Sequence, residues 1–309
     1  MSWNELKAKH AEIAFFYTKV GRVKRGGKKD ISSEVEIIKL WQEFSILANT
    51  PEDGHVPFIQ ILKILNAQAQ ALGRENVVIL DHGCNQAFTL LYLAARGFTN
   101  IYGVDLEASN CAMLNRFCSK ILGITGKRFY DFDGDVIPLS DGSVNLVISQ
   151  TVVEHVEPHL LEKYYQEAAR VLVEGGKAYY DIPVRSNLFD SHTGLWFLHY
   201  LPRPAWLFFV GALRGHERRE WARKYLFLRS SRRLKSLAKK AFGNVEDITF
   251  YRLIEAKTSD HFVGINRLRY RRELFTKLFM LPLFGPLLAK VLVPFVMMST
   301  ISTKVIRKN

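Results

Sequence analysis

Short apolar segments alternate with longer amphipathic segments between residues 77 and 182, and this alternation constrains the fold more than any other feature. The apolar segments with the length of buried strands are 77–80, 101–104, 127–130, 145–149 and 177–182. Helices are expected to begin near Ala87, Ser109 and Leu160. Since strands joined through helices run parallel with right-handed crossovers, the pattern predicts a doubly wound α/β core with helices on both faces.

The segment before this core predicts an N-terminal helical cap over residues 1–75. Apolar residues recur there at helical spacing in "SSEVEIIKLWQEFSILA" and "VPFIQILKILNAQAQALG". Ser33 and Glu36 have the spacing of a capping box at the start of the first of these helices. Gly73 is expected to end the second helix.

The segment after the core predicts an insertion and two further strands. The alternation stops at Pro183, and residues 186–298 form a hydrophobic and basic insertion that includes a sixth strand within "FGNVEDITFYRLI". The last residues, 299–309, predict a seventh strand that closes the core as its last edge. The whole pattern therefore predicts a seven-stranded, mostly parallel sheet.

Charge is concentrated in one part of the insertion. The chain of 309 residues has a formal net charge of +13, and residues 214–240 contain eleven basic residues and two acidic ones. This excess predicts an anionic partner, either nucleic acid or an acidic membrane surface. The neighbouring stretch "GLWFLHYLPRPAWLFFVGAL" is typical of helices in a membrane interface, or alternatively of a hydrophobic lid over the sheet. Charges and prolines interrupt it, so a membrane-spanning helix is not expected.

Cysteine usage and the N-terminal sequence indicate the compartment. Three cysteines, Cys84, Cys111 and Cys118, are too few and too irregularly spaced for a disulfide framework or a zinc site. The first sixteen residues contain charges throughout and lack a secretory signal pattern. We therefore expect a cytoplasmic protein, peripheral to the inner face of a membrane if the basic segment binds lipid.

The first predicted strand runs into a turn, "VVILDHGCNQAFTLL", that is suited to a ligand. Gly83 allows backbone amides to approach a ligand closely, and the following helix N-terminus carries a partial positive charge. Asp105 ends the second predicted strand, where a carboxylate can accept hydrogen bonds from both hydroxyls of a ribose. Together these residues predict a nucleoside site.

From Val77 to Pro183 the chain resembles the class I S-adenosylmethionine-dependent methyltransferases. Asp81, Gly83 and Cys84 match the first motif of that family, D-x-G-C-G-x-G, and Asp105 matches the ribose-binding acid. The segments "DFDGDVIPLSDGSVNLVISQTVVEHV" and "RVLVEGGKAYYDIP" resemble its later motifs.

The resemblance implies a Rossmann-like, cofactor-binding core over residues 76–185, with S-adenosyl-L-methionine as the cofactor. The cofactor-binding residues that it implies are Asp81, Gly83, Cys84, Asn85, Asp105, Leu106, Asp133 and Gln150. Asp131 is the alternative to Asp133 as the adenine-contacting acid. Asn85 and Ala87 replace two family glycines; asparagine tolerates a left-handed backbone, whereas the alanine methyl group is expected to loosen cofactor binding.

The acceptor side of the site is assigned to polar residues after the fourth and fifth strands. His155 is the first candidate for a base, with Glu154 beside it, because neutral imidazole is available near pH 7. His192 and His199 lie in "DSHTGLWFLHY" and are further catalytic candidates, accompanied there by Asp190 and Tyr200. The alternative for all of them is a structural role. Some related quinone-pathway enzymes bind a divalent metal through E-x-x-E-H, but Thr151 replaces the first glutamate, so no metal is predicted.

These observations predict a methyltransferase that acts by in-line methyl transfer on a small hydrophobic or lipid-linked acceptor, at oxygen. Nucleic acid is a weaker candidate, because the [DNS]-P-P-[YFW] motif is absent after the fourth strand and no cysteine fits C5 chemistry on cytosine. Two alternatives stay open. One is an RNA methyltransferase that binds phosphates through the basic segment, and the other is a noncatalytic binding protein on the same scaffold.

Overall fold

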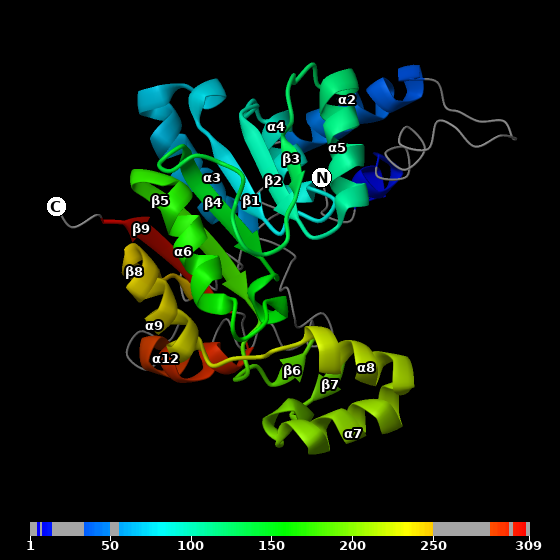
Figure 1. Ribbon diagram of the computed structural model, residues 1–309, viewed down its shortest axis with the longest axis vertical. Coiled ribbons are helices and arrows are strands. Elements are labelled where there is room, and N and C mark those ends of the chain that lie inside the picture. Colours follow the sequence, from blue (N-terminus) through cyan, green and yellow to red (C-terminus); the bar gives the residue numbers. More distant parts are fainter. Residues whose placement is uncertain are drawn as a thin grey trace, which may run out of the picture.

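The computed structural model describes residues 5–6, 8–13, 34–49, 56–249, 285–296 and 299–306. Its centre is a seven-stranded sheet in the order β3-β2-β1-β4-β5-β9-β8, with helices on both faces (Figure 1). The strands are β1 (Ile79–His82), β2 (Ile101–Asp105), β3 (Phe129–Asp131), β4 (Val144–Gln150), β5 (Leu172–Ile182), β6 (Phe189–Asp190), β7 (Leu195–Trp196), β8 (Gly243–Asp247) and β9 (Ser299–Val305). Strands β6 and β7 form a separate two-stranded sheet.

The helices follow the strands in alternation through the core. The α-helices are α2 (Glu34–Asn49), α3 (Val56–Leu72), α4 (Phe88–Ala95), α5 (Ala108–Ile121), α6 (Leu161–Val171), α7 (Arg203–Arg214), α8 (His216–Tyr225), α9 (Ser231–Phe242) and α12 (Gly285–Val296). The short 3₁₀ helices are η1 (Arg74–Asn76), η2 (Val153–His155) and η3 (Leu198–Tyr200). No helix within the described part of the chain is both long and apolar enough to cross a bilayer.

The predicted α/β fold is confirmed. Strands β1 to β5 are parallel to one another, whereas β9 runs antiparallel to both β5 and β8. The expectation that the last strand forms the edge of the sheet is wrong, because β9 lies between β5 and β8 and the edge belongs to β8. A strand that pairs on both sides satisfies its backbone groups without water, which fits the nearly complete burial of Ile301 and Thr303.

Alternating residues of the central strands supply two hydrophobic clusters, one on each face of the sheet. Ile79 and Leu146 pack on one face against α2, α3, α4 and α5. Leu80 and Val147 pack on the other face against α6 and α9. Because the central strands are covered on both sides, they consist of almost continuous apolar residues. These are the runs that the sequence pattern detects.

The N-terminal helices form as predicted, whereas the predicted insertion divides between a separate lobe and the core. Helices α2 and α3 match the two predicted segments, and the amide of Gly73 donates to Ala69 O after α3, as expected of a helix stop. Ser33 lies outside the described residues. Within the predicted insertion, β6, β7, α7 and α8 form a lobe with its own hydrophobic cluster around Trp206 and Val210, whereas α9 and β8 join the core (Figure 1).

Candidate functional site

The site lies at the carboxyl ends of β1, β2 and β4. Strand β1 pairs with β2 on one side and with β4 on the other, so the chain order reverses at β1. Ligands of open parallel sheets bind beyond the strand ends at such a point. The carboxyl ends of these strands and the loops that follow them carry seven of the eight residues that the sequence predicts for cofactor binding.

The loop from β1 to α4 depends on three residues with left-handed backbone. Gly83 has φ +94°, Asn85 has φ +45° and Ala87 has φ +57°. A Cβ atom on Gly83 would lie 2.5 Å from Val152 Cγ2, so this position requires glycine for space as well as for conformation. Asn85 adopts the left-handed backbone expected of it. The buried Ala87 does so too, and its amide donates to Cys84 O at 2.6 Å.

Asp105 links this loop to the end of β2. Its Oδ2 accepts a hydrogen bond from the amide of Asn85 at 2.7 Å, and its Oδ1 accepts one from the amide of Glu107 at 3.0 Å. A carboxylate has about four lone-pair sites, so two remain for a ligand. Asp105 is half-buried. It therefore neither lies free in bulk water nor is enclosed by the loop.

Asp81 and Cys84 lie deeper than Asp105. Burial, reinforced by the charge of Asp105, raises the pKa of Asp81 to about 7. The Cys84 thiol lies beside that of Cys111, and this contact together with burial raises the pKa of Cys84 well above its usual range. Both side chains are thus buried at the floor of the predicted cofactor site.

Gln150 and Leu106 stand at the ends of β4 and β2. The Oε1 of Gln150 accepts a hydrogen bond from Thr89 Oγ1 at 2.8 Å, which joins the end of β4 to the first turn of α4. Leu106 exposes 75% of its surface, a large value for a leucine and one consistent with an apolar contact for a ligand.

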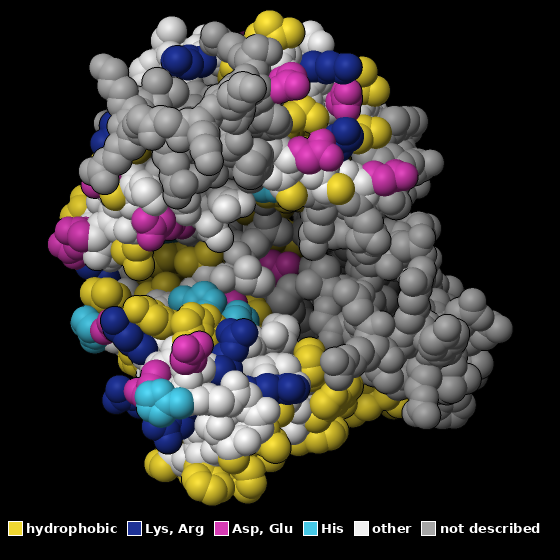
Figure 2. All heavy atoms as spheres, turned by 90° about the vertical axis from the view of Figure 1, so that its right-hand side faces the viewer, with side chains coloured by type: hydrophobic (Ala, Val, Ile, Leu, Met, Phe, Trp, Pro, Cys, Tyr) yellow, Lys and Arg dark blue, Asp and Glu magenta, His cyan; other side chains and the backbone are white. Residues whose placement is uncertain are grey.

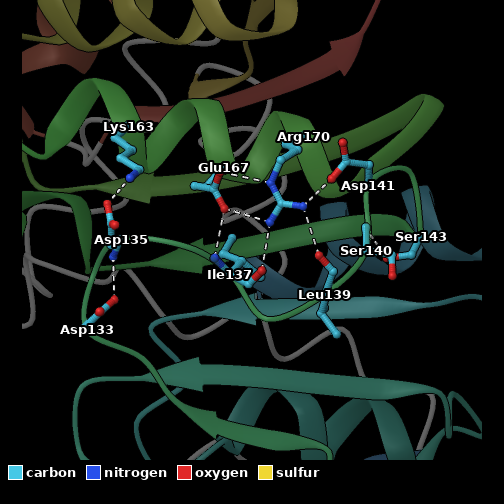
Figure 3. Close-up of polar contacts among 10 residues, drawn as sticks. All are labelled: Asp133, Asp135, Ile137, Leu139, Ser140, Asp141, Ser143, Lys163, Glu167 and Arg170. Carbon is cyan, nitrogen blue, oxygen red and sulfur yellow. Dashed lines mark hydrogen bonds and ion pairs between the residues drawn. The ribbon is translucent and has the colours of Figure 1, made fainter.

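Asp131 ends β3 and Asp133 lies in the loop that follows, and both are exposed. Asp133 Oδ1 accepts a hydrogen bond from the amide of Asp135 at 2.9 Å, which is the geometry of an Asx turn (Figure 3). Asp135 pairs with Lys163 of α6 in turn. Asp131 lies 3.6 Å from Lys127 Nζ. Asp133 therefore has a turn role in this structure, with its second oxygen free of any bond described here.

A guanidinium holds the remainder of this loop against α6. Arg170 donates to both carboxylate oxygens of Glu167 and to the carbonyl oxygens of Ile137 and Leu139 (Figure 3). Glu167 also accepts from the amide of Ile137 at 2.9 Å. The loop that carries Asp133 is thereby anchored by a bidentate, partly buried ion pair.

On the acceptor side, Glu154, His155 and His192 form a compact group. Glu154 Oε1 lies 3.3 Å from His192 Nε2 and 3.8 Å from His155 Nε2. The Glu154 side chain is fully buried, whereas the His192 and His155 side chains expose 15% and 32% of their surface. Figure 2 shows histidine side chains at the rim of a hollow between the lobe of α7 and α8 and the core above it. The structure thus brings together three of the four predicted catalytic residues.

Contacts on the outer side fix both imidazole rings. His155 Nδ1 lies 2.7 Å from Tyr225 O, and since a carbonyl oxygen only accepts, Nδ1 carries the proton and Nε2 the lone pair. His192 Nδ1 lies 3.6 Å from Asp190 Oδ1. Burial alone would lower the pKa of His192, but the flanking carboxylates of Asp190 and Glu154 raise it to about 9. Trp221 stacks on the His192 ring at 6.0 Å between centroids.

His199 and Tyr200 do not join this group. His199 Nε2 lies 2.6 Å from Asn187 O, and the Tyr200 hydroxyl donates to Ser186 O at 2.6 Å. These contacts tie η3 to the loop after β5, so both side chains have the structural role that the sequence left open as an alternative.

Two contributions to the site have no motif in the sequence. The half-buried His10 imidazole packs edge-on against Phe88 at 4.5 Å and hydrogen-bonds the backbone of Gln86, so the N-terminal segment covers the β1–α4 loop. Arg229 donates to the carbonyl oxygens of Val153 and Val156 and so supports η2 from beneath. The basic segment predicts Arg229 only as part of a surface charge, yet the side chain is buried.

The central part of the chain matches a known protein family. Residues 80–180 match the family of the methyltransferase domain. The 2-heptyl-1-hydroxyquinolin-4(1H)-one methyltransferase of Mycobacteroides abscessus is 28% identical over 130 residues, which are 42% of this chain and 54% of that protein. The chain therefore spans about half the length of this curated relative.

Solved structures also resemble the chain. Geranyl diphosphate C-methyltransferase from Streptomyces coelicolor, solved with Mg²⁺, geranyl diphosphate and S-adenosyl-L-homocysteine, has a TM-score of 0.44 and 15% identity over 97% of this chain and 98% of its own. An S-adenosylmethionine-dependent methyltransferase from Mesorhizobium loti has a TM-score of 0.44 and 16% identity over 78% of this chain and 96% of its own.

Proposed function

Because residues 80–180 form a methyltransferase domain of the class I S-adenosylmethionine-dependent family, we propose that this protein transfers a methyl group from S-adenosylmethionine to a small hydrophobic acceptor, at oxygen. The domain match covers the strand ends at which Asp81, Gly83 and Asp105 lie. The acceptor side is the group of Glu154, His155 and His192.

The arrangement of Asp105 is the observation that carries this proposal. Its carboxylate holds the β1–α4 loop through the Asn85 amide and keeps lone pairs for the two hydroxyls of a ribose. The exposed Leu106 then provides an apolar neighbour for an adenine ring. A nucleoside bound here would have its sulfonium near the β1–α4 loop and Asp81.

A hydroxyl acceptor fits the polar group at the other side of the site. In-line transfer forms a carbon–oxygen bond as the carbon–sulfur bond of the sulfonium breaks, and S-adenosylhomocysteine leaves. The hydroxyl proton would pass to His155 Nε2, which carries a lone pair because Nδ1 donates to Tyr225 O. The name of the curated relative describes an aromatic N-hydroxyl compound with a heptyl chain. We propose acceptors of that kind, a hydroxyl on an apolar body.

We further propose that the protein meets such acceptors at a membrane surface in the cytoplasm. Phe208, Phe209 and Leu213 on α7 expose 66%, 38% and 57% of their surfaces. Figure 2 shows hydrophobic side chains at the lower end of the molecule, with Lys and Arg side chains nearby. This combination suits an interfacial helix at an anionic lipid surface.

Calorimetry with S-adenosylhomocysteine tests the cofactor part. We expect the wild-type chain to bind one equivalent, and Asp105→Asn to bind at least tenfold more weakly because a charge-assisted hydrogen-bond acceptor is lost. Glu246→Gln, exposed on β8 at the far edge of the sheet, is the matched control and should bind like the wild type. Absence of binding by the wild type would favour the noncatalytic scaffold.

The acceptor part is tested with labelled S-adenosylmethionine and a panel of alkyl hydroxyquinolones, alkyl phenols and RNA. Incorporation into the alkyl hydroxyl compounds supports the proposal. Incorporation into RNA, with binding that falls steeply as salt rises, would support the RNA methyltransferase instead.

A further inference from the structure

The Glu154 side chain is unusual for a buried acid. Both carboxylate oxygens are enclosed, and neither makes a hydrogen bond to any residue that the structure describes. Its closest polar neighbours described here are the Nε2 atoms of His192 and His155, at 3.3 and 3.8 Å. A buried carboxylate normally has several hydrogen bonds or a metal ion to compensate for its lost hydration. The compensation for Glu154 therefore comes through its two histidine neighbours, either as a proton on His192 or as a cation that both rings bind.

The two imidazoles face Glu154 with equivalent atoms. Each directs Nε2 towards the carboxylate, and each has Nδ1 beside an oxygen acceptor on its far side, Tyr225 O for His155 and Asp190 Oδ1 for His192. The rings are nearly perpendicular, at 81° with centroids 5.0 Å apart. In histidines that ligate metals, an outer acceptor fixes the tautomer and leaves the inner nitrogen free to coordinate. His155 has this hydrogen bond, and Asp190 Oδ1 lies 3.6 Å from His192 Nδ1, slightly beyond hydrogen-bond distance.

We propose that Glu154, His155 and His192 form a binding site for a divalent transition-metal ion. Their donor atoms lie within 4.8 Å of one another. Bonds of about 2.0–2.1 Å in tetrahedral geometry separate neighbouring ligand atoms by roughly 3.3 Å, so the Glu154–His192 pair already has the required spacing and the Glu154–His155 pair needs a small closure.

The donor set selects the kind of metal. Two imidazoles and one carboxylate suit Zn²⁺ or Fe²⁺, whereas Mg²⁺ prefers oxygen ligands in octahedral geometry. Three protein ligands leave at least one coordination position open, and His155 is the most exposed of the three. The site therefore resembles a catalytic metal centre more closely than a closed structural one.

The sequence pattern rejects a metal because Thr151 replaces the first acid of E-x-x-E-H, but the third ligand comes from elsewhere in the chain. The hairpin of β6 and β7 carries His192 at its tip, where Gly194 has φ +68° and donates to Asp190 O at 2.8 Å. Arg214 of α7 donates to the carbonyl oxygens of Thr193 and Gly194 and fixes the hairpin beside η2.

Metal binding does not depend on the proposed methyl transfer, although the two are compatible. In a metal-bound protein the His155 Nε2 lone pair would be occupied by the metal and could not accept the hydroxyl proton. The metal would instead lower the pKa of a hydroxyl at its open position. A protein that binds metal but transfers no methyl group would contradict only the proposed function, and active protein that binds no metal would contradict only this inference.

The test uses the full-length protein stripped with EDTA and titrated with Zn²⁺ against a chromophoric chelator, and with Co²⁺ followed by its visible absorption. We expect one equivalent of each ion per chain, with no competition from millimolar Mg²⁺. His192→Gln and His155→Gln should weaken binding at least tenfold, and Asp190→Asn about tenfold through loss of the carboxylate charge beside His192. His159→Gln, an exposed histidine beside Glu157, is the matched control and should bind like the wild type.

Near-ultraviolet circular dichroism in EDTA checks the fold of each variant. His155 is one-third exposed, so its replacement keeps the test decisive if the His192 variant unfolds. Wild-type protein that binds neither ion, or variants that bind with wild-type affinity and stoichiometry, would overturn the site. The group would then be a buried imidazolium held between the carboxylates of Glu154 and Asp190.

Discussion

At the Asp81 side chain, burial and a neighbouring carboxylate act in the same direction. Both favour the protonated acid, so the pKa of Asp81 rises from 3.8 in the unfolded chain to about 7 in the folded one. A group whose pKa is raised by folding keeps its proton longer in the folded state. The unfolded state therefore binds fewer protons between about pH 4 and 7, and the free energy of unfolding falls over that window and is flat above it.

Asp81→Asn should remove this penalty, because the amide does not ionise. We expect the variant to gain about 1–3 kcal/mol in the free energy of unfolding relative to the wild type between pH 5 and pH 8, an order-of-magnitude value from the pKa shift. Urea unfolding without cofactor measures the difference. Asp131→Asn, exposed at the same sheet edge, should show no such gain. If the free energy of unfolding of Asp81→Asn changes with pH in the same way as that of the wild type, the pKa of Asp81 is not raised by folding.

Sequence reasoning finds residues such as Asp81, Gly83 and Asp105 because each lies at or next to the carboxyl end of a strand, and the parallel sheet brings these ends to one edge. Sequence reasoning does not distinguish His192, which lies beside Glu154, from His199, which does not. The two lie seven positions apart in one polar and aromatic stretch, but only His192 is at a hairpin tip facing Glu154. That difference depends on how the hairpin packs, which no local spacing encodes.

At the scale of elements, the β1–α4 turn requires glycine at position 83 for two separate reasons, its backbone conformation and the space beside Val152. A methyl group on Gly83 would lie within 2.6 Å of both methyl carbons of Val152 in a backbone with φ +94°. Gly126 has φ +82° with no atom within 4 Å of its virtual Cβ, so Gly126→Ala reports the backbone cost alone.

We expect Gly126→Ala to lower the free energy of unfolding by about 1 kcal/mol and Gly83→Ala by about 2–4 kcal/mol, the excess coming from the clash. Val152→Ala in the Gly83→Ala background should recover part of that excess. Urea unfolding of the three variants measures both contributions, and equal losses in the two single variants would show that Val152 does not confine the turn.

The last strands show what the pattern of elements leaves undetermined. The sequence predicts strands near 243–247 and 299–305. Their positions within the sheet, however, depend on long-range strand pairing. Strand β9 pairs with β5 from Lys177 to Ile182 and leaves its other side to β8. The sequences of β8 and β9 alone do not show which of the two strands lies inside the sheet.

At the scale of the whole molecule, the proposed cofactor site lies in the core, whereas the proposed acceptor site joins Glu154 and His155 of the core to His192 of the lobe. The core supplies Asp81 and Asp105, and the lobe of α7 and α8 is attached to it through the segment after α8. Phe227 N donates to Glu154 O at 2.8 Å, and Arg229 supports the neighbouring carbonyl groups. The lobe therefore directly positions the group of Glu154, His155 and His192. The other face of α7 points outward.

That outward face leads to a prediction about the intact protein. Phe208 and Leu213 are 66% and 57% exposed on α7, and Arg218 on α8 is exposed as well. Burial of each apolar side chain in lipid contributes about 1.5–3 kcal/mol, so Phe208→Ser with Leu213→Ser should reduce binding to phosphatidylglycerol vesicles at least tenfold. Flotation at low salt measures the bound fraction.

The control for this experiment is a pair of equally exposed apolar residues far from α7. Val35→Ser with Ile46→Ser on α2 removes side chains that are 71% and 68% exposed, and it should leave flotation unchanged. If both pairs reduce binding equally, adhesion is nonspecific, and if the wild type stays unbound at low salt, α7 does not meet lipid. Helix α7 also carries Arg214, which fixes the β6–β7 hairpin beside Glu154. A lipid-bound α7 would therefore place Glu154, His155 and His192 near the membrane surface.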